Sequence, residues 1–249
     1  MHPKISLLSR VGYQRKYSTT SPKKKPELPK TGNTAPAVAQ TSPLMARRCC
    51  SMRYVSLDLE TTGGNPRRHQ ILELAAVVED TRHPLPLPEL PAFRRVVRHS
   101  ELVGTAGALA LNAGLLQELA RKEPNPQLCS PEDLLPQLRE FLLAQGFKTD
   151  KNDCVTVTMA GKNIAVFDLG FLRELPGYGT LVRAEPAMLD PAAFYLNWRK
   201  DTRLPTMQIC KARAGFEDDT VAHQALADAL DVVQLLRPFY ERPSYKMHE

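Results

Sequence analysis

The stretch VSLDLETTGG, residues 55–64, combines the pattern of a buried strand with two acidic side chains. Because residues i and i+2 of a strand point to the same face, Asp58 and Glu60 project together while the valine and leucines beside them pack into a core. Two carboxylates held so close repel each other and lose hydration. We therefore expect a basic residue or a metal ion to complete this site.

The segments after residue 53 alternate between strand and helix patterns. Three strand patterns, RYVSLDL, ILELAAVVED and AFRRVVRH, follow one another with tight connections, which predicts an antiparallel meander. GALALNAGLLQELARK and PEDLLPQLREFLLAQG have helical patterns, the second with Ser130 as N-cap and Pro131 in the first turn. We expect LVGTAGALALNAGLL to form a buried turn and helix.

The second half of the chain continues this alternation. DCVTVTMAG predicts one short strand, and helices are predicted at NIAVFDLGFLREL, DPAAFYLNW, LPTMQICKARAG and HQALADALDVVQLLRPFY. No apolar run approaches the ~18 residues of a membrane span, so we expect no membrane partner. The predicted fold class is α/β, with one domain large enough to bury a core.

Charge divides the chain into two parts. Residues 1–53 carry eleven Lys or Arg against Glu27 alone, a balance of 11 − 1 = +10, and the remaining residues carry 22 basic and 26 acidic side chains, hence −4. We expect residues 1–52 to form a disordered basic arm, residues 53–240 to form the domain, and residues 241–249 to form a short tail.

The first twenty residues, MHPKISLLSRVGYQRKYSTT, are basic, hydroxylated and free of acids, and they resemble a mitochondrial presequence. Two other interpretations stay open: a polyanion-binding arm, or an extended gene start in which Met45 or Met52 begins the protein. The five cysteines form no CxxC pair and no zinc-ligand spacing, and their odd number favours a reducing compartment. We expect an intracellular protein, mitochondrial or else cytoplasmic or nuclear.

Two further acids stand in apolar surroundings. Asp168 lies within NIAVFDLGFL, and Asp228 lies within HQALADALDVV, five residues after His223. Most acids in such helices face water, so either one alone indicates little. Together with Asp58 and Glu60 they form a set of four carboxylates and one imidazole.

These three motifs resemble the DEDDh, or DnaQ-like, exonucleases of the ribonuclease H-like fold. The resemblance rests on DLETTG, on NIAVFDLGFL and on HQALADA, and it extends from residue 53 to about residue 240 in the family's order. It implies a mixed five-stranded sheet with flanking helices. It also implies 3′-to-5′ cleavage that releases nucleoside 5′-monophosphates from single-stranded DNA or RNA ends.

The resemblance assigns roles to these residues. Asp58, Glu60, Asp168 and Asp228 are expected to bind two Mg²⁺ or Mn²⁺ ions, since hard oxygen ligands suit these cations better than zinc. His223 is expected to take the proton from the attacking water, because imidazole exchanges protons near neutral pH.

Substrate contacts are expected from Leu59 and Thr61, beside the metal-binding strand, and from Asn163, which matches the family's Asn before the third acid. Lys162 departs from the pattern, because many relatives have His-Asn where this chain has Lys-Asn. Asn163 also lies five residues before Asp168, where proofreading members commonly have four. The subfamily is therefore not assigned.

Two other functions are compatible with the same residues. One is a nucleic-acid-binding or polymerase accessory module that keeps the fold without the chemistry. The other is an endonuclease of the ribonuclease H type, against which the HQALADA arrangement argues. The choice between DNA and RNA, a homodimer and a polymerase partner are left open.

Overall fold

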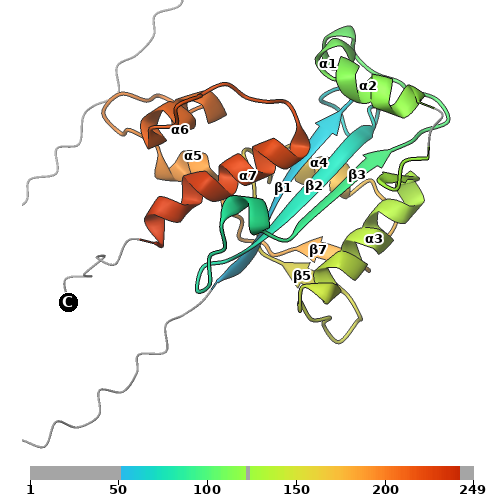
Figure 1. Ribbon diagram of the computed structural model, residues 1–249, viewed down its shortest axis with the longest axis horizontal. Coiled ribbons are helices and arrows are strands. Elements are labelled where there is room, and N and C mark those ends of the chain that lie inside the picture. Colours follow the sequence, from blue (N-terminus) through green and yellow to red (C-terminus); the bar gives the residue numbers. More distant parts are fainter. Residues whose placement is uncertain (1–51, 122–123, 242–249) are drawn as a thin grey trace, which may run out of the picture. The chain divides into compact units, whose positions relative to one another are not determined.

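The central part of the molecule is an antiparallel meander. The computed structural model describes residues 52–121 and 124–241, so the predictions for residues 1–51 and 242–249 lie outside the described residues. Strands β1 (Arg53–Thr61), β2 (Ile71–Asp80) and β3 (Ala92–Val97) pair in sequence order and run antiparallel (Figure 1). The predicted meander is confirmed.

Two short strands extend the meander at its edges. β4 (Leu128–Cys129) pairs in parallel with β3, and β6 (Met159–Ala160) pairs in parallel with β1. The sheet order is β4-β3-β2-β1-β6. The predicted mixed five-stranded sheet is therefore present.

The segment predicted as one strand at DCVTVTMAG instead forms two strands in two sheets. β5 (Val155–Val157) pairs with β7 (Val182–Ala184) in a separate two-stranded sheet, whereas β6 joins β1. The change of partner occurs at Thr158, whose carbonyl accepts from the Val55 amide at 2.9 Å. Local periodicity carries no information about which neighbour accepts these bonds.

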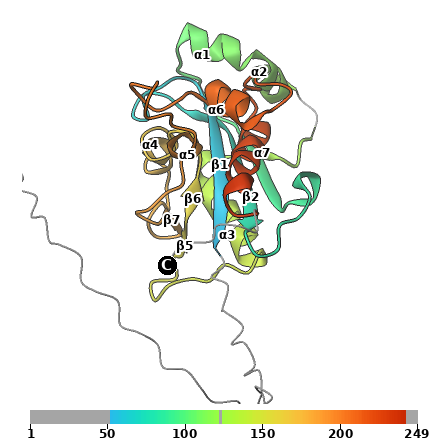
Figure 2. The ribbon, with the colours of Figure 1, turned by 90° about the vertical axis from the view of Figure 1, so that its left-hand side faces the viewer.

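Helices cover both faces of the large sheet. α7 (Ala225–Leu236) packs on β1 and β2, with α5 (Pro191–Phe194) and α6 (Met207–Ala214) beside it (Figure 2). α3 (Pro131–Ala144) covers the opposite face, and its four buried leucines join the core formed by β1, β2 and β3. The Ser130 hydroxyl accepts from the Asp133 amide at 3.2 Å, so the predicted N-cap is present.

The helix predicted over residues 107–122 is broken in two. α1 (Ala106–Leu111) and α2 (Ala113–Ala120) meet at Asn112, and neither contains a buried residue. The expectation of a buried turn and helix is wrong, because Leu102, Val103 and Leu111 are all exposed. These helices lie beyond one end of the sheet, above the tip of β1 (Figure 1).

The remaining short elements connect the layers. They are the 3₁₀ helices η1 (Leu87–Glu89) and η2 (Arg237–Phe239) and the single-turn helix α4 (Asp168–Leu172). Across residues 52–121 and 124–241, no helix combines the length and apolar character needed to cross a bilayer.

Candidate active site

One face of β1 carries the first two acids toward α7. Tyr54 and Ser56 lie on that face, and the Ser56 hydroxyl donates to the Ala229 carbonyl at 2.7 Å. Because side chains alternate along a strand, Asp58 and Glu60 continue the same face. The small side chain of Ala229, fully buried, lets α7 approach the strand closely.

Asp228 meets these two acids from the first turns of α7. Carboxylate oxygens of Asp58, Glu60 and Asp228 all lie within 4.8 Å of one another. Glu60 and Asp228 are buried, and Asp58 is half-buried. Three carboxylates at this spacing repel one another strongly unless protons or cations are shared among them.

Asp168, the first residue of α4, lies against the same strand, β1. It is 2% exposed, and its carboxylate accepts a hydrogen bond from the backbone of Leu59. Among the neighbouring charges, Asp168 contributes most to raising the pKa of Asp58. It lies outside the group of three acids within 4.8 Å, yet it is electrostatically part of the cluster.

Burial raises the pKa of all four carboxyl groups, and repulsion among the four adds to this for Asp58, Glu60 and Asp168. Burial is the largest cause for each, and it raises the pKa of Asp58 well above its usual range. Burial raises the pKa of Glu60 to about 7, with further increases from the charges of Asp228 and Glu73. Burial likewise raises the pKa of Asp168 to about 7 and raises that of Asp228.

Asp228 provides the clearest test of whether this cluster suits a metal ion. Its Oδ2 accepts from the Gln224 amide at 3.2 Å, but its Oδ1 is buried without a hydrogen-bond partner. A buried carboxylate oxygen with no partner is strongly unfavourable in water-excluded surroundings. A hard divalent cation would supply the missing partner, so the donor set fits Mg²⁺ or Mn²⁺.

Asp58, Glu60 and Asp228 line a pocket of about 380 Å³, and Asp168 is not part of its lining. Apolar side chains form much of its wall, and His223 and Lys162 add nitrogen groups. The lining includes Asp58, Leu59, Glu60, Thr61, Ala108, Leu111, Asn112, Lys162, Phe167, Met207, His223 and Asp228. Such a mixture can hold a small ligand whose one end is charged and whose other end is apolar.

His223 stands at the rim of this pocket, two residues before α7. Its side chain is exposed, its backbone φ is 49°, and its charge lowers the pKa of Asp228. It also lines a second cavity of about 500 Å³, together with Glu73 and Arg94. Left-handed backbone is uncommon for a residue other than glycine, so this conformation must be imposed by the surroundings.

The three expected substrate contacts are placed differently from one another. Leu59 and Thr61 line the pocket, and the Thr61 hydroxyl donates to the Gly63 carbonyl at 3.0 Å. Asn163 does not line it: its backbone N–H donates to Asp190 Oδ2 at 2.9 Å, and its side-chain Oδ1 accepts from Lys162 at 2.6 Å. Lys162 occupies the pocket wall instead.

Asn112 is a pocket residue that sequence reasoning missed. Its side chain is buried and donates to the Thr61 carbonyl at 3.3 Å. It also hydrogen-bonds Glu60, and this bond partly offsets the rise that burial causes in the pKa of that acid. An amide inside the apolar run GALALNAGLL was the available signal. For Met207, the first residue of α6, no local signal existed.

Comparison with known proteins gives likeness in structure alone. No protein-family model matches the chain, and no curated protein sequence matches it. One similar structure is an Exonuclease I from Methylocaldum szegediense, with 17% identity and a TM-score of 0.47 over 78% of this chain. The chain spans 41% of that protein's length.

For two shorter structures, the match covers most of both chains. The nuclease domain of 3′hExo, a DEDDh family member bound to rAMP, has 15% identity and a TM-score of 0.56 over 76% of this chain and 92% of its own. The chain has the same fold as this nuclease domain. A full-length 3′-exonuclease is also similar to this chain, with 16% identity and a TM-score of 0.51 over 76% of this chain and 81% of its own.

Proposed function

We propose that the protein is a metal-dependent 3′-to-5′ exonuclease that releases nucleoside 5′-monophosphates from single-stranded DNA or RNA ends. The observation that carries this proposal is the cluster of Asp58, Glu60 and Asp228, together with the unpartnered Asp228 Oδ1. The DEDDh fold of the chain supports the proposal.

Asp58, Glu60, Asp168 and Asp228 would hold two Mg²⁺ or Mn²⁺ ions. When bound, such ions stabilise the charge that develops on the attacking and leaving oxygens of a phosphodiester displacement. The acids themselves lose repulsion when the ions arrive, because each carboxylate gains a positive neighbour. Ion binding would therefore offset part of the free-energy cost of burying these carboxylates.

His223 is the proposed general base. It lies at the rim of the pocket, is open to water, and is near enough to Asp228 to change the pKa of that acid. It would take the proton from a water molecule that attacks the terminal phosphodiester. The bond between phosphorus and the 3′ oxygen breaks, and that oxygen stays on the shortened strand and takes up a proton from water. The phosphate departs as the 5′-phosphate of the released nucleotide.

The apolar side chains of the pocket are proposed to bind the terminal nucleoside. Leu59, Leu111, Phe167 and Met207 line the same pocket as the acids. Apolar and aromatic side chains stack on bases with little regard to sequence. We therefore expect the proposed nuclease to accept different bases at the strand end.

The test is a time course with 5′-labelled single-stranded DNA and RNA of equal sequence, in Mg²⁺, Mn²⁺ or EDTA. A metal-dependent ladder that shortens from the 3′ end supports the proposal, and the faster polymer identifies the substrate class. The Asp58→Ala and Asp168→Ala variants should lose this activity but still fold, because removing one carboxylate relieves repulsion.

The same experiment separates the other two functions. Intact substrate throughout, from a folded protein that binds metal, would identify a binding or polymerase accessory module. Cleavage of a circular single strand would identify an endonuclease, since a circle has no 3′ end. Either result would replace the exonuclease assignment.

A further inference from the structure

A fifth acid, itself buried, lies beside the four proposed ligands and has no part in the chemistry above. Glu73 on β2 is 3% exposed and pairs across the sheet with Glu60 on β1. Its charge raises the pKa of both Asp58 and Glu60. A buried carboxylate that adds to this repulsion must be stabilised by other contacts.

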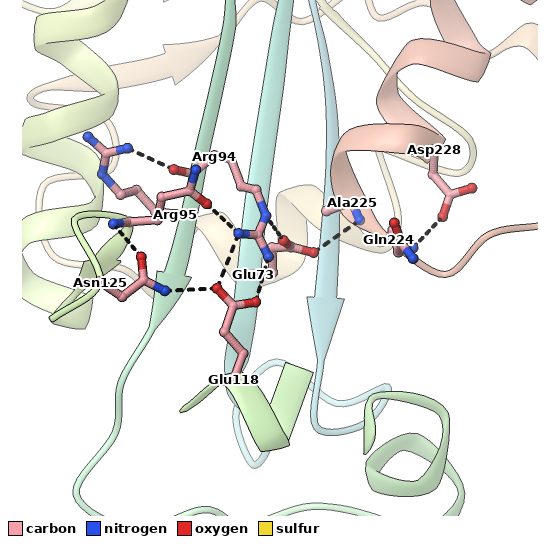
Figure 3. A network of polar contacts seen from close by, with 9 residues as sticks. Glu73, Arg94, Arg95, Glu118, Asn125, Gln224, Ala225 and Asp228 are labelled. Atoms are coloured by element: carbon pink, nitrogen blue, oxygen red, sulfur yellow. Dashed lines mark hydrogen bonds and ion pairs between the residues drawn. The ribbon is translucent and has the colours of Figure 1, made fainter. Parts of the chain in front are cut away.

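Arg94 on β3 neutralises one side of Glu73. The Arg94 Nε donates to Glu73 Oε1, its Nη2 pairs with Glu118 on α2 at 3.0 Å, and its Nη1 donates to Gln127 (Figure 3). Asn125 also donates to Glu118 at 2.8 Å. The guanidinium is thus held from three directions, which fixes the Glu73 carboxylate in turn.

The other oxygen of Glu73 contacts the beginning of α7. Glu73 Oε2 accepts from the Ala225 amide at 3.1 Å, across 152 residues of sequence (Figure 3). The N-cap residue of α7, Gln224, makes no side-chain capping bond. Glu73 therefore caps this helix from a neighbouring strand, where the helix dipole also favours a negative charge.

The capped turn carries two of the proposed catalytic groups. His223 comes two residues before Ala225, and Asp228 comes three residues after it. The Gln224 amide is bound by Asp228 Oδ2, and the Ala225 amide is bound by Glu73. Without the bond from Glu73, the Ala225 amide would lose its acceptor, and the first turn would be held by the two hydrogen bonds between Gln224 and Asp228.

We propose that Glu73 is a positioning residue of the active site, which holds the first turn of α7 so that Asp228 and His223 face the pocket. This inference rests on the proposed nuclease function for its kinetic consequence. The network behind Glu73 extends the same support to α2, whose preceding residue, Asn112, contacts Glu60. Glu73 is thereby linked directly to α7 and, through Arg94 and Glu118, to α2.

A matched control exists at the other end of the same strand and helix. Glu79 on β2 is fully buried and pairs with Arg237, at the end of α7, at 2.7 Å. Glu79→Gln removes a buried ion pair between β2 and the residue that follows α7, whereas Glu73→Gln removes one between β2 and β3 beside the start of that helix. Glu79 does not line the pocket. Both variants are therefore expected to reduce stability.

The experiment compares both variants with the full-length protein in steady-state exonuclease kinetics, in urea unfolding, and in amide hydrogen exchange. Glu73→Gln should lower kcat at least tenfold with KM changed less than threefold, and should accelerate exchange at Ala225. Glu79→Gln should leave kcat and the Ala225 exchange within twofold of the unmodified protein.

A kcat for Glu73→Gln equal to that of Glu79→Gln would overturn the proposal, since Glu73 would then be structural only. If Glu73→Gln does not fold, exchange in the unmodified protein decides: protection of Ala225 well above that of His223 supports the cap, and equal exchange refutes it. An unmodified protein with no nuclease activity would refute the proposed function, while the Ala225 exchange would still test the cap.

Discussion

At the scale of single residues, the acidic cluster stores unfavourable free energy in the metal-free protein. Glu60 and Asp168 each have a pKa of about 7 in the folded chain, against 4.5 and 3.8 for the free side chains. The folded state therefore binds more protons than the unfolded state between about pH 4 and pH 7. Stability must fall as the pH rises through this window, by about 1.4 kcal/mol per pH unit for each such group.

We expect the metal-free protein to be more stable at pH 5 than at pH 8 in urea unfolding followed by circular dichroism. Mg²⁺ or Mn²⁺ should restore stability at pH 8 and have little effect at pH 5, where protons occupy the carboxylates. The Asp168→Asn variant should show a shallower decline with pH. Metal-free stability that rises steadily from pH 5 to pH 8 would show that the acids are not coupled in this way.

At the scale of elements, the turn between β6 and α4 determines where Asp168 reaches β1. A Cβ added at Gly161 would lie 2.8 Å from the Leu57 carbonyl oxygen and 3.0 Å from the Ile164 Cβ. The chain then passes through Asn163, whose φ is 57°, before α4 begins at Asp168. The close approach of this turn to β1 is what brings the Asp168 carboxylate to the Leu59 backbone.

Gly161→Ala should destabilise the protein by about 1–3 kcal/mol, because the added methyl group overlaps a backbone atom that cannot move alone. Gly107→Ala is the matched control, since a Cβ there meets nothing within 4 Å inside helix α1. This second change should stabilise the protein by about 0.5–1 kcal/mol. Urea midpoints measure both, and equal effects of the two alanines would contradict the packing argument.

At the scale of the whole molecule, the pocket that should receive a polyanion belongs to an acidic part of the chain. Residues 1–53 carry a balance of +10 and the rest carries −4, from the overall +6. Bound cations would supply the positive charge at the acids, whereas the basic residues of the N-terminal segment attract any polyanion. The two contributions should respond differently to salt and to metal removal.

In the Asp168→Asn variant, which should not degrade its ligand, binding of a labelled oligothymidylate in EDTA should weaken at least tenfold between 50 and 200 mM KCl. In the unmodified protein, binding of a nucleoside 5′-monophosphate should instead require Mn²⁺ and change little with KCl. Fluorescence anisotropy and calorimetry measure the two. Monophosphate binding that is unchanged by EDTA would argue against a metal-dependent pocket.

Local sequence determined many of the strands and helices of this protein, because the alternation of side chains along a strand and the capping of a helix depend on near neighbours. The i, i+2 spacing placed Asp58 and Glu60 on one face of β1, and Ser130 marked the start of α3. The three motifs also led to the four acids and His223, whose catalytic roles stay predictions. These signals are readable because strand and helix periods act within a few residues.

Only the tertiary structure decided which distant groups meet. Residues 155–160 divide between two sheets because different strands accept their hydrogen bonds, and Lys162 rather than Asn163 faces the pocket. In the sequence, Glu73 is a single acid within an apolar strand pattern, yet in the structure it accepts a hydrogen bond from the Ala225 backbone amide, 152 residues away. Such contacts depend on how strands and helices pack in space, which no local pattern encodes.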